Sequence, residues 1–170
     1  EAVEELQSII AFRPHSPAAF EAHLALARHY DSQGDIEAES EYKEAMELDR
    51  PLALRLEFAR WLEKRGRTQE AYQEYKALLS SHPVAFVDMR RTATDPLVLA
   101  SDLNAARYFN DTLEVLRTVE DAEAIPLRAE TLYELDRYEE AKAEYEARLE
   151  MEPDDGQAHL GLAGTLSRLG

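Results

Sequence analysis

The sequence predicts an all-α protein built from repeated pairs of antiparallel helices. Three observations predict this class. Apolar residues recur at steps of three and four along almost the whole chain, which is the period of an amphipathic helix. The six glycines and seven prolines are few and spaced at intervals, as expected for many helices joined by short turns. A longer spacing of small, aromatic and proline residues repeats on top of the helical period.

The longer period is close to 34 residues. Steps of 3, 4, 5, 4, 3 and 5 residues connect Ala59, Leu62, Gly66, Ala71, Tyr75, Leu78 and Pro83. The same steps connect Ala129, Leu132, Asp136, Ala141, Tyr145, Arg148 and Pro153, and again Ala100, Leu103, Arg107, Thr112, Leu116, Val119 and Ala124. A slightly shifted copy runs through Ala27, Tyr30, Gly34, Ala38, Tyr42, Ala45 and Pro51. From Ala27 to Ala163 is 136 residues, which is four units of 34.

This unit resembles the tetratricopeptide repeat (TPR), a helix-turn-helix unit of about 34 residues. The resemblance is strongest at 66–71 and 136–141, which match the turn and the start of the second helix. It is weakest at 84–124, where no glycine marks the turn and no proline closes the unit. The resemblance implies a right-handed α-solenoid of about four full repeats flanked by two half repeats, with the first helices lining a concave face.

The elements follow in order from this register. We expect a single second helix over about residues 1–12 and a single first helix over about 155–169, with the usual boundary error of about two to four residues. Between them we expect helix pairs at 17–32 with 35–48, 52–65 with 68–80, 96–106 with 109–120, and 124–135 with 138–151. The repeats would cover about 17–51, 52–83, 84–121 and 122–153, with half repeats at 1–14 and 154–170. All of this would form one domain, 1–170, cut from a longer protein, because the chain lacks an initiator methionine.

Each repeated residue has a physical role in such a unit. Paired helices approach closely at a small residue, which is the role expected of Ala59, Ala100, Ala129 and Ala163. A left-handed residue that ends a helix favours glycine, as at Gly34, Gly66 and Gly170. Tyr42, Tyr75 and Tyr145 are expected to fill space between one unit and the next. Prolines terminate second helices, as expected of Pro51, Pro83 and Pro153. A capping side chain followed by proline starts a helix, as at Ser16-Pro17 and Asp95-Pro96.

The register breaks near residues 84–92, where seven residues exceed the repeat length. One interpretation is an extra turn of helix that buries Phe86 and Met89, since apolar side chains are costly to leave in water. The alternative is a basic contact surface for an acidic partner, formed by Arg90 and Arg91 with basic residues of the preceding repeat. The second hypothesis predicts that reversing both charges weakens binding and leaves stability nearly intact.

Composition excludes several classes of protein. With 35 acidic and 19 basic residues the net charge is -16, which opposes nucleic acid or anionic lipid as a partner. The absence of cysteine excludes disulfides, thiolate zinc sites and a cysteine nucleophile, and favours a cytoplasmic location. No apolar run is long enough to insert into a membrane. No phosphate loop, nucleophile elbow or metal-binding histidine pair occurs, so we expect no catalytic residue, no metal and no cofactor, and hence no enzyme.

Some charged and aromatic residues remain as candidates. Acidic clusters such as 37–41 are expected to form solvated faces, since catalytic acids need a partly desolvated cleft. Residues 50–92 hold nine basic and five acidic side chains, in contrast to the acidic remainder. Trp61, the only tryptophan, is expected to be a packing residue.

The resemblance also implies a binding face. Residues that match the groove positions of the family are Arg28, Arg60, Lys64, Ser101, Asn104, Glu130, Tyr133 and Arg168. Arg60, Ser101 and Glu130 stand where family members that clamp chaperone tails carry asparagine, so that particular function is not expected.

The predicted function is a non-enzymatic scaffold that binds a peptide or helix of another protein along the concave groove. The alternative is a structural spacer or self-association arm of a larger protein, in which further repeats of the parent chain are the partner. Single helices at the two ends would expose apolar residues such as Leu6, Ile9, Leu162 and Leu166, which favours end-to-end self-association.

Overall fold

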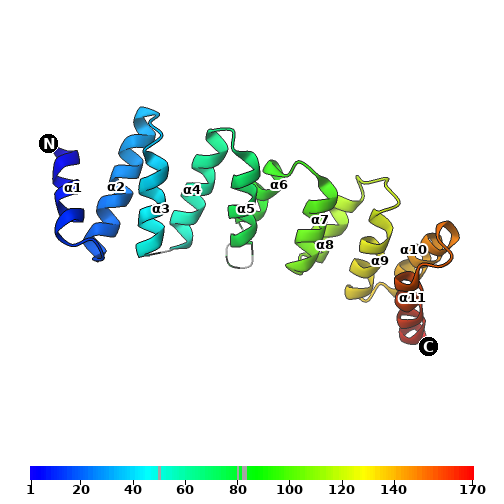
Figure 1. Cartoon of the computed structure of the whole chain (residues 1–170). Helices are drawn as coiled ribbons and strands as arrows, with labels where there is room; N and C mark the ends of the chain where they lie inside the picture. Colours follow the sequence, from blue (N-terminus) through cyan, green and yellow to red (C-terminus); the bar gives the residue numbers. More distant parts are fainter. Residues whose placement is uncertain (50, 80, 82–83) are drawn as a thin grey trace. The chain divides into compact units, whose positions relative to one another are not determined.

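The computed structural model describes residues 1–49, 51–79, 81 and 84–170, and these residues form helices and no strands. The all-α class is therefore confirmed (Figure 1). The helices are α1 (Ala2–Phe12), α2 (Pro17–Gln33), α3 (Ala38–Leu48), α4 (Leu52–Lys64), α5 (Thr68–Leu78), α6 (Val84–Thr92), α7 (Pro96–Ala105), α8 (Phe109–Leu116), α9 (Ala124–Glu134), α10 (Tyr138–Met151) and α11 (Gly156–Leu169).

The chain consists of two compact units. The N-terminal unit covers Glu1–Thr92 and holds α1 to α6, and the C-terminal unit covers Ala93–Gly170 and holds α7 to α11. The expected division into repeats within one domain stays a prediction, and each unit is described by itself below.

Two helix pairs, α2 with α3 and α4 with α5, form the centre of the N-terminal unit. The Ser16 side chain accepts a hydrogen bond from the Ala19 amide and so caps α2, as its sequence predicts. Gly34 ends α2 with φ 77° and Gly66 follows α4 with φ 75°, the left-handed conformation that a side chain disfavours. Helix α1 packs against α2, and α6 packs against α5, so the six helices lie side by side in chain order (Figure 1).

Small and aromatic side chains fill the interfaces of this unit. Ala27, Ala59 and Ala71 are completely buried, which lets the paired helices approach closely. Tyr42 and Tyr75 are also buried, so the tyrosine positions of the repeat have the packing role that their spacing predicts.

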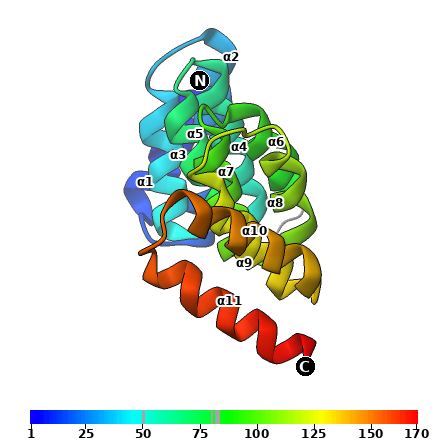
Figure 2. The ribbon, with the colours of Figure 1, turned by 90° about the vertical axis from the view of Figure 1, so that its right-hand side faces the viewer.

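The C-terminal unit holds the pairs α7 with α8 and α9 with α10, and α11 packs along α10 (Figure 2). The Asp95 carboxylate accepts hydrogen bonds from the Leu97 and Val98 amides and caps α7. Arg107 and Asp136 adopt positive φ, 66° and 58°, in the turns inside the two pairs. The turn after α7 thus keeps the left-handed residue even though the sequence supplies no glycine there.

The prediction that Ala163 lies at a close approach of two helices is wrong. Ala163, at the small position of the repeat, is exposed instead of buried, because no second helix of the described chain packs on that side of α11. The buried residues of α11 are Ala158 and Thr165, which face α10. Between them the Tyr145 ring lies against the backbone of Gly161, so close that a Cβ atom there would collide with it.

The residues beyond the repeat length form helix α6. Ala85 and Met89 are completely buried and Phe86 is half-buried, whereas Val87 is exposed. The interpretation as additional helix is therefore confirmed, with Met89 deeper in the core than Phe86.

Helix α6 is the last helix of the N-terminal unit and packs on α5, just as α11 is the last helix of the C-terminal unit and packs on α10. In both, an alanine and a threonine seven residues later are buried, Ala85 and Thr92 in α6, and Ala158 and Thr165 in α11. Each threonine hydroxyl donates to the carbonyl four residues earlier. Both helices thus have the character of a first helix docked on the preceding second helix.

Apolar side chains are exposed on the terminal helices, as expected. Phe12 is 79% exposed, and Ile9 is also exposed on α1. On α11 the exposed apolar side chains are Leu160, Leu166 and Leu169. Leu6 and Leu162 are half-buried.

The three prolines predicted to end second helices differ in where the structure places them. Pro51 precedes the first residue of α4 as its N-cap, and Pro153 follows α10. Pro83 lies outside the described residues.

Candidate functional site

Ion pairs connect the first helices of the N-terminal unit. Arg28 on α2 donates two hydrogen bonds of 2.8 Å to the Glu57 carboxylate on α4. Arg60 on α4 donates two, of 3.2 and 2.9 Å, to Asp88 on α6. In each case the arginine follows the buried alanine of its helix, and the acid lies 29 or 28 residues later. We call these two contacts the arginine clasps.

The clasps lie within a larger polar network. The Tyr42 hydroxyl donates to Glu57 at 3.1 Å, and the hydrogen bonds from Arg28 hold the pKa of Glu57 below its ordinary value. Burial raises the pKa of Tyr42 above its ordinary value. The Asp88 side chain is only 7% exposed and forms ion pairs with Arg60 and Arg91.

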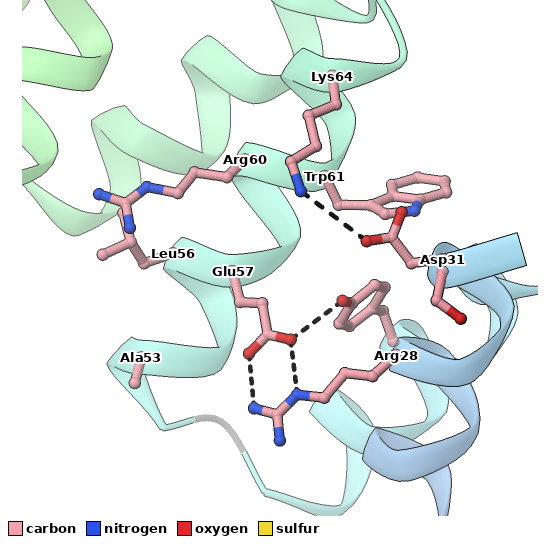
Figure 3. A pocket seen from close by; sticks show the side chains of 10 residues that line it. Arg28, Asp31, Ala53, Leu56, Glu57, Arg60, Trp61 and Lys64 are labelled. Carbon is pink, nitrogen blue, oxygen red and sulfur yellow. Dashed lines mark hydrogen bonds and ion pairs between the residues drawn. The ribbon is translucent and has the colours of Figure 1, made fainter. Parts of the chain in front are cut away.

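A pocket of about 480 Å³ opens between α2 and α4 beside the first clasp (Figure 3). We call it the first-helix pocket. Its lining combines charged, apolar and aromatic side chains: Arg28, Asp31, Ser32, Tyr42, Ala53, Leu56, Glu57, Arg60, Trp61 and Lys64. This volume is within the range of about 300–1,000 Å³ that is usual for ligand sites.

Trp61 forms part of the wall of the first-helix pocket and is 2% exposed. Its ring stacks on Phe58 with centroids 5.8 Å apart and an interplanar angle of 11°, which confirms its packing role. The indole Nε1 is buried and has no hydrogen-bond acceptor within the described part of the chain. A buried donor without an acceptor is uncommon and is costly in water-excluded surroundings.

Lys64 supplies a cation at the rim of the pocket. Its ammonium lies 4.0 Å from the Asp31 carboxylate, and its side chain is 72% exposed. Figure 3 shows Lys64 reaching toward Asp31 across the pocket from the Arg28–Glu57 clasp. Lys64 is therefore held more loosely than the two clasp arginines.

The structure separates the predicted groove residues into two sets. Arg28, Arg60 and Lys64 all line the first-helix pocket. The rest lie in the C-terminal unit: Ser101, Asn104, Glu130, Tyr133 and Arg168.

Those C-terminal residues have contacts of their own. Asn104 accepts a hydrogen bond of 3.0 Å from Thr131, and Tyr133 packs edge-on against Tyr138. Arg168 donates to the Tyr138 hydroxyl at 3.1 Å. Ser101 and Glu130 are exposed.

The two arginines of α6 also have defined places. Arg90 is exposed on α6. Arg91 donates two hydrogen bonds of 2.7 Å to Glu63 on α4 and lies 3.0 Å from Asp88. These hydrogen bonds hold the pKa of Glu63 below its ordinary value. Arg91 thus joins α6 to α4, a structural role that was not expected from the sequence.

Reversing the charge of Arg91 is therefore expected to destabilise the N-terminal unit. The Arg91→Glu variant would place a third carboxylate beside Glu63 and Asp88, at a cost of about 1 kcal/mol, the upper value for exposed pairs. Arg13→Glu is the matched control, since Arg13 makes no ion pair within the described residues. Equal unfolding midpoints of the two variants in urea would contradict the structural role.

The sequence analysis did not identify several acids that form ion pairs in the structure. Glu57 and Asp88 were not singled out, although a carboxylate 28 or 29 residues after each arginine was a readable signal.

The 37–41 cluster was expected to face solvent, which is wrong for two of its members. Glu39 pairs with Arg67 and Lys43, whose hydrogen bonds lower its pKa to about 2, and Glu41 lies 2.6 Å from the His23 ring.

No group of three or more histidine, aspartate or glutamate side chains among the described residues is arranged to hold a metal ion. No helix in the same residues combines the length and apolar character that crossing a membrane requires.

Within each unit the helix pairs and the helix docked on them have a TPR-like fold. No protein-family model and no curated protein matches the chain. Among solved structures the chain is similar to a tetratricopeptide repeat protein from Parabacteroides merdae, with a TM-score of 0.42 and 22% identity, over 89% of this chain and 60% of that one. The chain thus spans less than two thirds of that protein's length.

Two other solved structures are similar at the same level. A TPR protein of Thermus thermophilus matches with a TM-score of 0.38 and 18% identity, over 86% of this chain and 98% of its own. PilF of Pseudomonas aeruginosa matches with a TM-score of 0.43 and 20% identity, over 96% of this chain and 74% of its own.

Proposed function

We propose that this chain is a non-enzymatic protein-interaction scaffold whose N-terminal unit binds a segment of a partner protein in the first-helix pocket. The observation that carries the proposal is the first-helix pocket itself, which has a volume of about 480 Å³ and is lined by apolar, aromatic and charged side chains. A concave site of this size with a mixed lining can take up side chains of a bound segment.

The remaining lining gives each side chain a part in binding. Ala53 and Leu56 offer apolar surface in the lining of the same pocket, and burying apolar surface supplies most of the affinity of a groove for a peptide. Arg28 and Glu57 satisfy each other, so they shape the pocket. Lys64 is exposed and loosely paired, so it is the cation most available to an acidic group of the partner.

A specific observation also favours the second candidate, a structural or self-association arm. The exposed apolar residues of α1 and α11, Phe12 and Leu160 above all, are suited to contacts with another helix. This candidate differs from the first in needing no occupant in the first-helix pocket.

A peptide selection tests the first candidate. Peptides of about twelve residues would be selected from a random library on the immobilised chain, and their affinities measured for the wild type and two variants. We expect Lys64→Glu to weaken binding by about tenfold, equivalent to about 1.4 kcal/mol. Lys43→Glu is the control, because Lys43 is an exposed lysine of the same unit that lies outside this pocket.

The outcomes separate the two candidates. Loss of affinity in Lys64→Glu alone supports peptide binding in the first-helix pocket. If no peptide is selected, or if both variants bind as the wild type does, the pocket is not the site. Concentration-dependent sedimentation of the wild-type chain alone would then favour the self-association arm.

A further inference from the structure

A second pocket, of about 340 Å³, lies in the C-terminal unit among α8, α9 and α10. Three arginines line it, Arg117 from α8, Arg128 from α9 and Arg137 from the start of α10. Residues 93–170 contain only seven lysines and arginines and eighteen acidic residues. Three of those seven cations thus converge on one small pocket in an otherwise acidic unit.

Two of the three guanidinium groups have donors to spare. The Arg128 Nε is buried and has no acceptor among the described residues. Its other nitrogens lie 3.5 Å from Glu144 and from the Val119 carbonyl, at the long limit for a hydrogen bond. The Arg117 side chain is exposed and makes no hydrogen bond within the described chain.

The third arginine is already satisfied. Arg137 donates hydrogen bonds of 2.7 and 2.6 Å to the two oxygens of Glu140. This contact lowers the pKa of Glu140, so Glu140 carries a full negative charge at neutral pH. The pocket therefore holds three positive charges against the two of Glu140 and Glu144, and the spare donors lie on the Arg117 and Arg128 side.

We propose that this pocket binds a carboxylate carried on an apolar stem, between the Arg117 and Arg128 side chains. A single carboxylate neutralises the one excess positive charge, and its two oxygens match the parallel N–H bonds of a guanidinium. A phosphate, which carries close to two negative charges near neutral pH, would leave an excess negative charge beside Glu140 and Glu144.

The apolar part of the lining fits the stem of such a group. Leu113, Leu132 and Ala143 form it, and methylene groups of an acidic side chain or of a chain-terminal residue can pack on them. This pocket shares no residue with the first-helix pocket and lies in the other unit. The inference is thus independent of the function proposed above.

Nuclear magnetic resonance on the full chain tests the proposal, because the Arg128 Nε–Hε group gives its own signal. Three probes separate the sources of the carboxylate. Acetyl-Leu-Glu-Leu-amide carries it on a side chain, acetyl-Leu-Gln-Leu carries it at the chain end, and acetyl-Leu-Gln-Leu-amide has none. We expect at least one carboxylate probe to shift the Arg128 signal saturably, with a Kd of roughly 1–10 mM, and the neutral probe to leave it unmoved.

Variants test the residues assigned to the pocket. Arg117→Gln is expected to weaken binding at least threefold, and Arg128→Lys, followed through the backbone amide of Ala143, at least tenfold. Arg107→Gln is the control, since Arg107 is an exposed arginine of the same unit outside the pocket. If Arg128→Lys fails to fold, Arg117→Gln carries the test, because the Arg117 side chain makes no hydrogen bond to the residues that the structure describes.

Each remaining outcome overturns the proposal. No saturable shift with either carboxylate probe, at ionic strength matched with sodium chloride, means that the pocket binds no carboxylate. Tighter binding of inorganic phosphate than of both carboxylate probes refutes the charge argument. An equal loss of affinity in Arg107→Gln and Arg117→Gln shows a general effect of net charge in place of a site.

Discussion

Replacing Trp61 with alanine is expected to lower the free energy of unfolding by about 3–5 kcal/mol, the usual cost of truncating a buried large aromatic side chain. Trp61 is among the largest fully buried side chains. Its ring stacks on Phe58 and contacts Tyr42 with centroids 6.0 Å apart. The change would leave a cavity where α2, α3 and α4 meet.

The conservative variant Trp61→Phe separates packing from polarity. Because the indole Nε1 has no acceptor in the described chain, phenylalanine would lose volume but no hydrogen bond, and we expect a smaller loss than with alanine. Urea denaturation followed by circular dichroism measures both variants. If the two variants lost equal stability, the loss would come from the indole N–H and not from packing, and the nitrogen would have an internal partner.

The second large effect is expected at Gly161. A methyl group there would collide with the end of the Tyr145 ring, which is itself buried. Overpacking of this kind costs about 1–3 kcal/mol. The Gly161→Ala variant should therefore loosen α11 from α10 and lower the melting temperature of the C-terminal unit.

Gly164→Ala is the matched comparison in the same helix. Its new methyl group would meet only Tyr133, at 4.0 Å, an ordinary contact. Alanine is better than glycine in a helix interior by up to about 1 kcal/mol, so this variant should stabilise α11. Stabilisation by both variants would show that helix propensity, and not the Tyr145 contact, decides the stability of α11.

The sequence predicts most of the fold because the repeat encodes contacts between neighbouring helices. The turns at Gly34 and Gly66, the caps at Ser16 and Asp95, and the buried tyrosines were all readable from spacing. Arg107 was not readable as a left-handed residue, since its conformation is set by the helices it joins. Ala163 was misassigned because the repeat pattern does not say whether a second helix is present beside it.

The candidate site was predictable only in part. Arg28, Arg60 and Lys64 followed from the register, and the structure places all three around the first-helix pocket. The spacing of Glu57 and Asp88 after the two arginines was a signal, but spacing alone does not show that these acids form ion pairs with them. That outcome depends on side-chain geometry between helices almost thirty residues apart.

The C-terminal pocket was not predictable from the sequence. Its three arginines lie at the end of α8, within α9 and at the start of α10, at unrelated positions of the repeat. Only packing brings them together.

Because the substantial contacts join helices that are near neighbours along the chain, stability in each unit accumulates step by step, and no single central core governs it. Proteins built this way behave approximately as a one-dimensional array with nearest-neighbour coupling, so local opening can occur without global unfolding. Helix α1 contains no buried residue and is joined mainly to α2. We therefore expect α1 to open before the other helices of the N-terminal unit. Amide hydrogen exchange in α1 should then be faster than in the helices that bury Trp61, Phe58 and Tyr42.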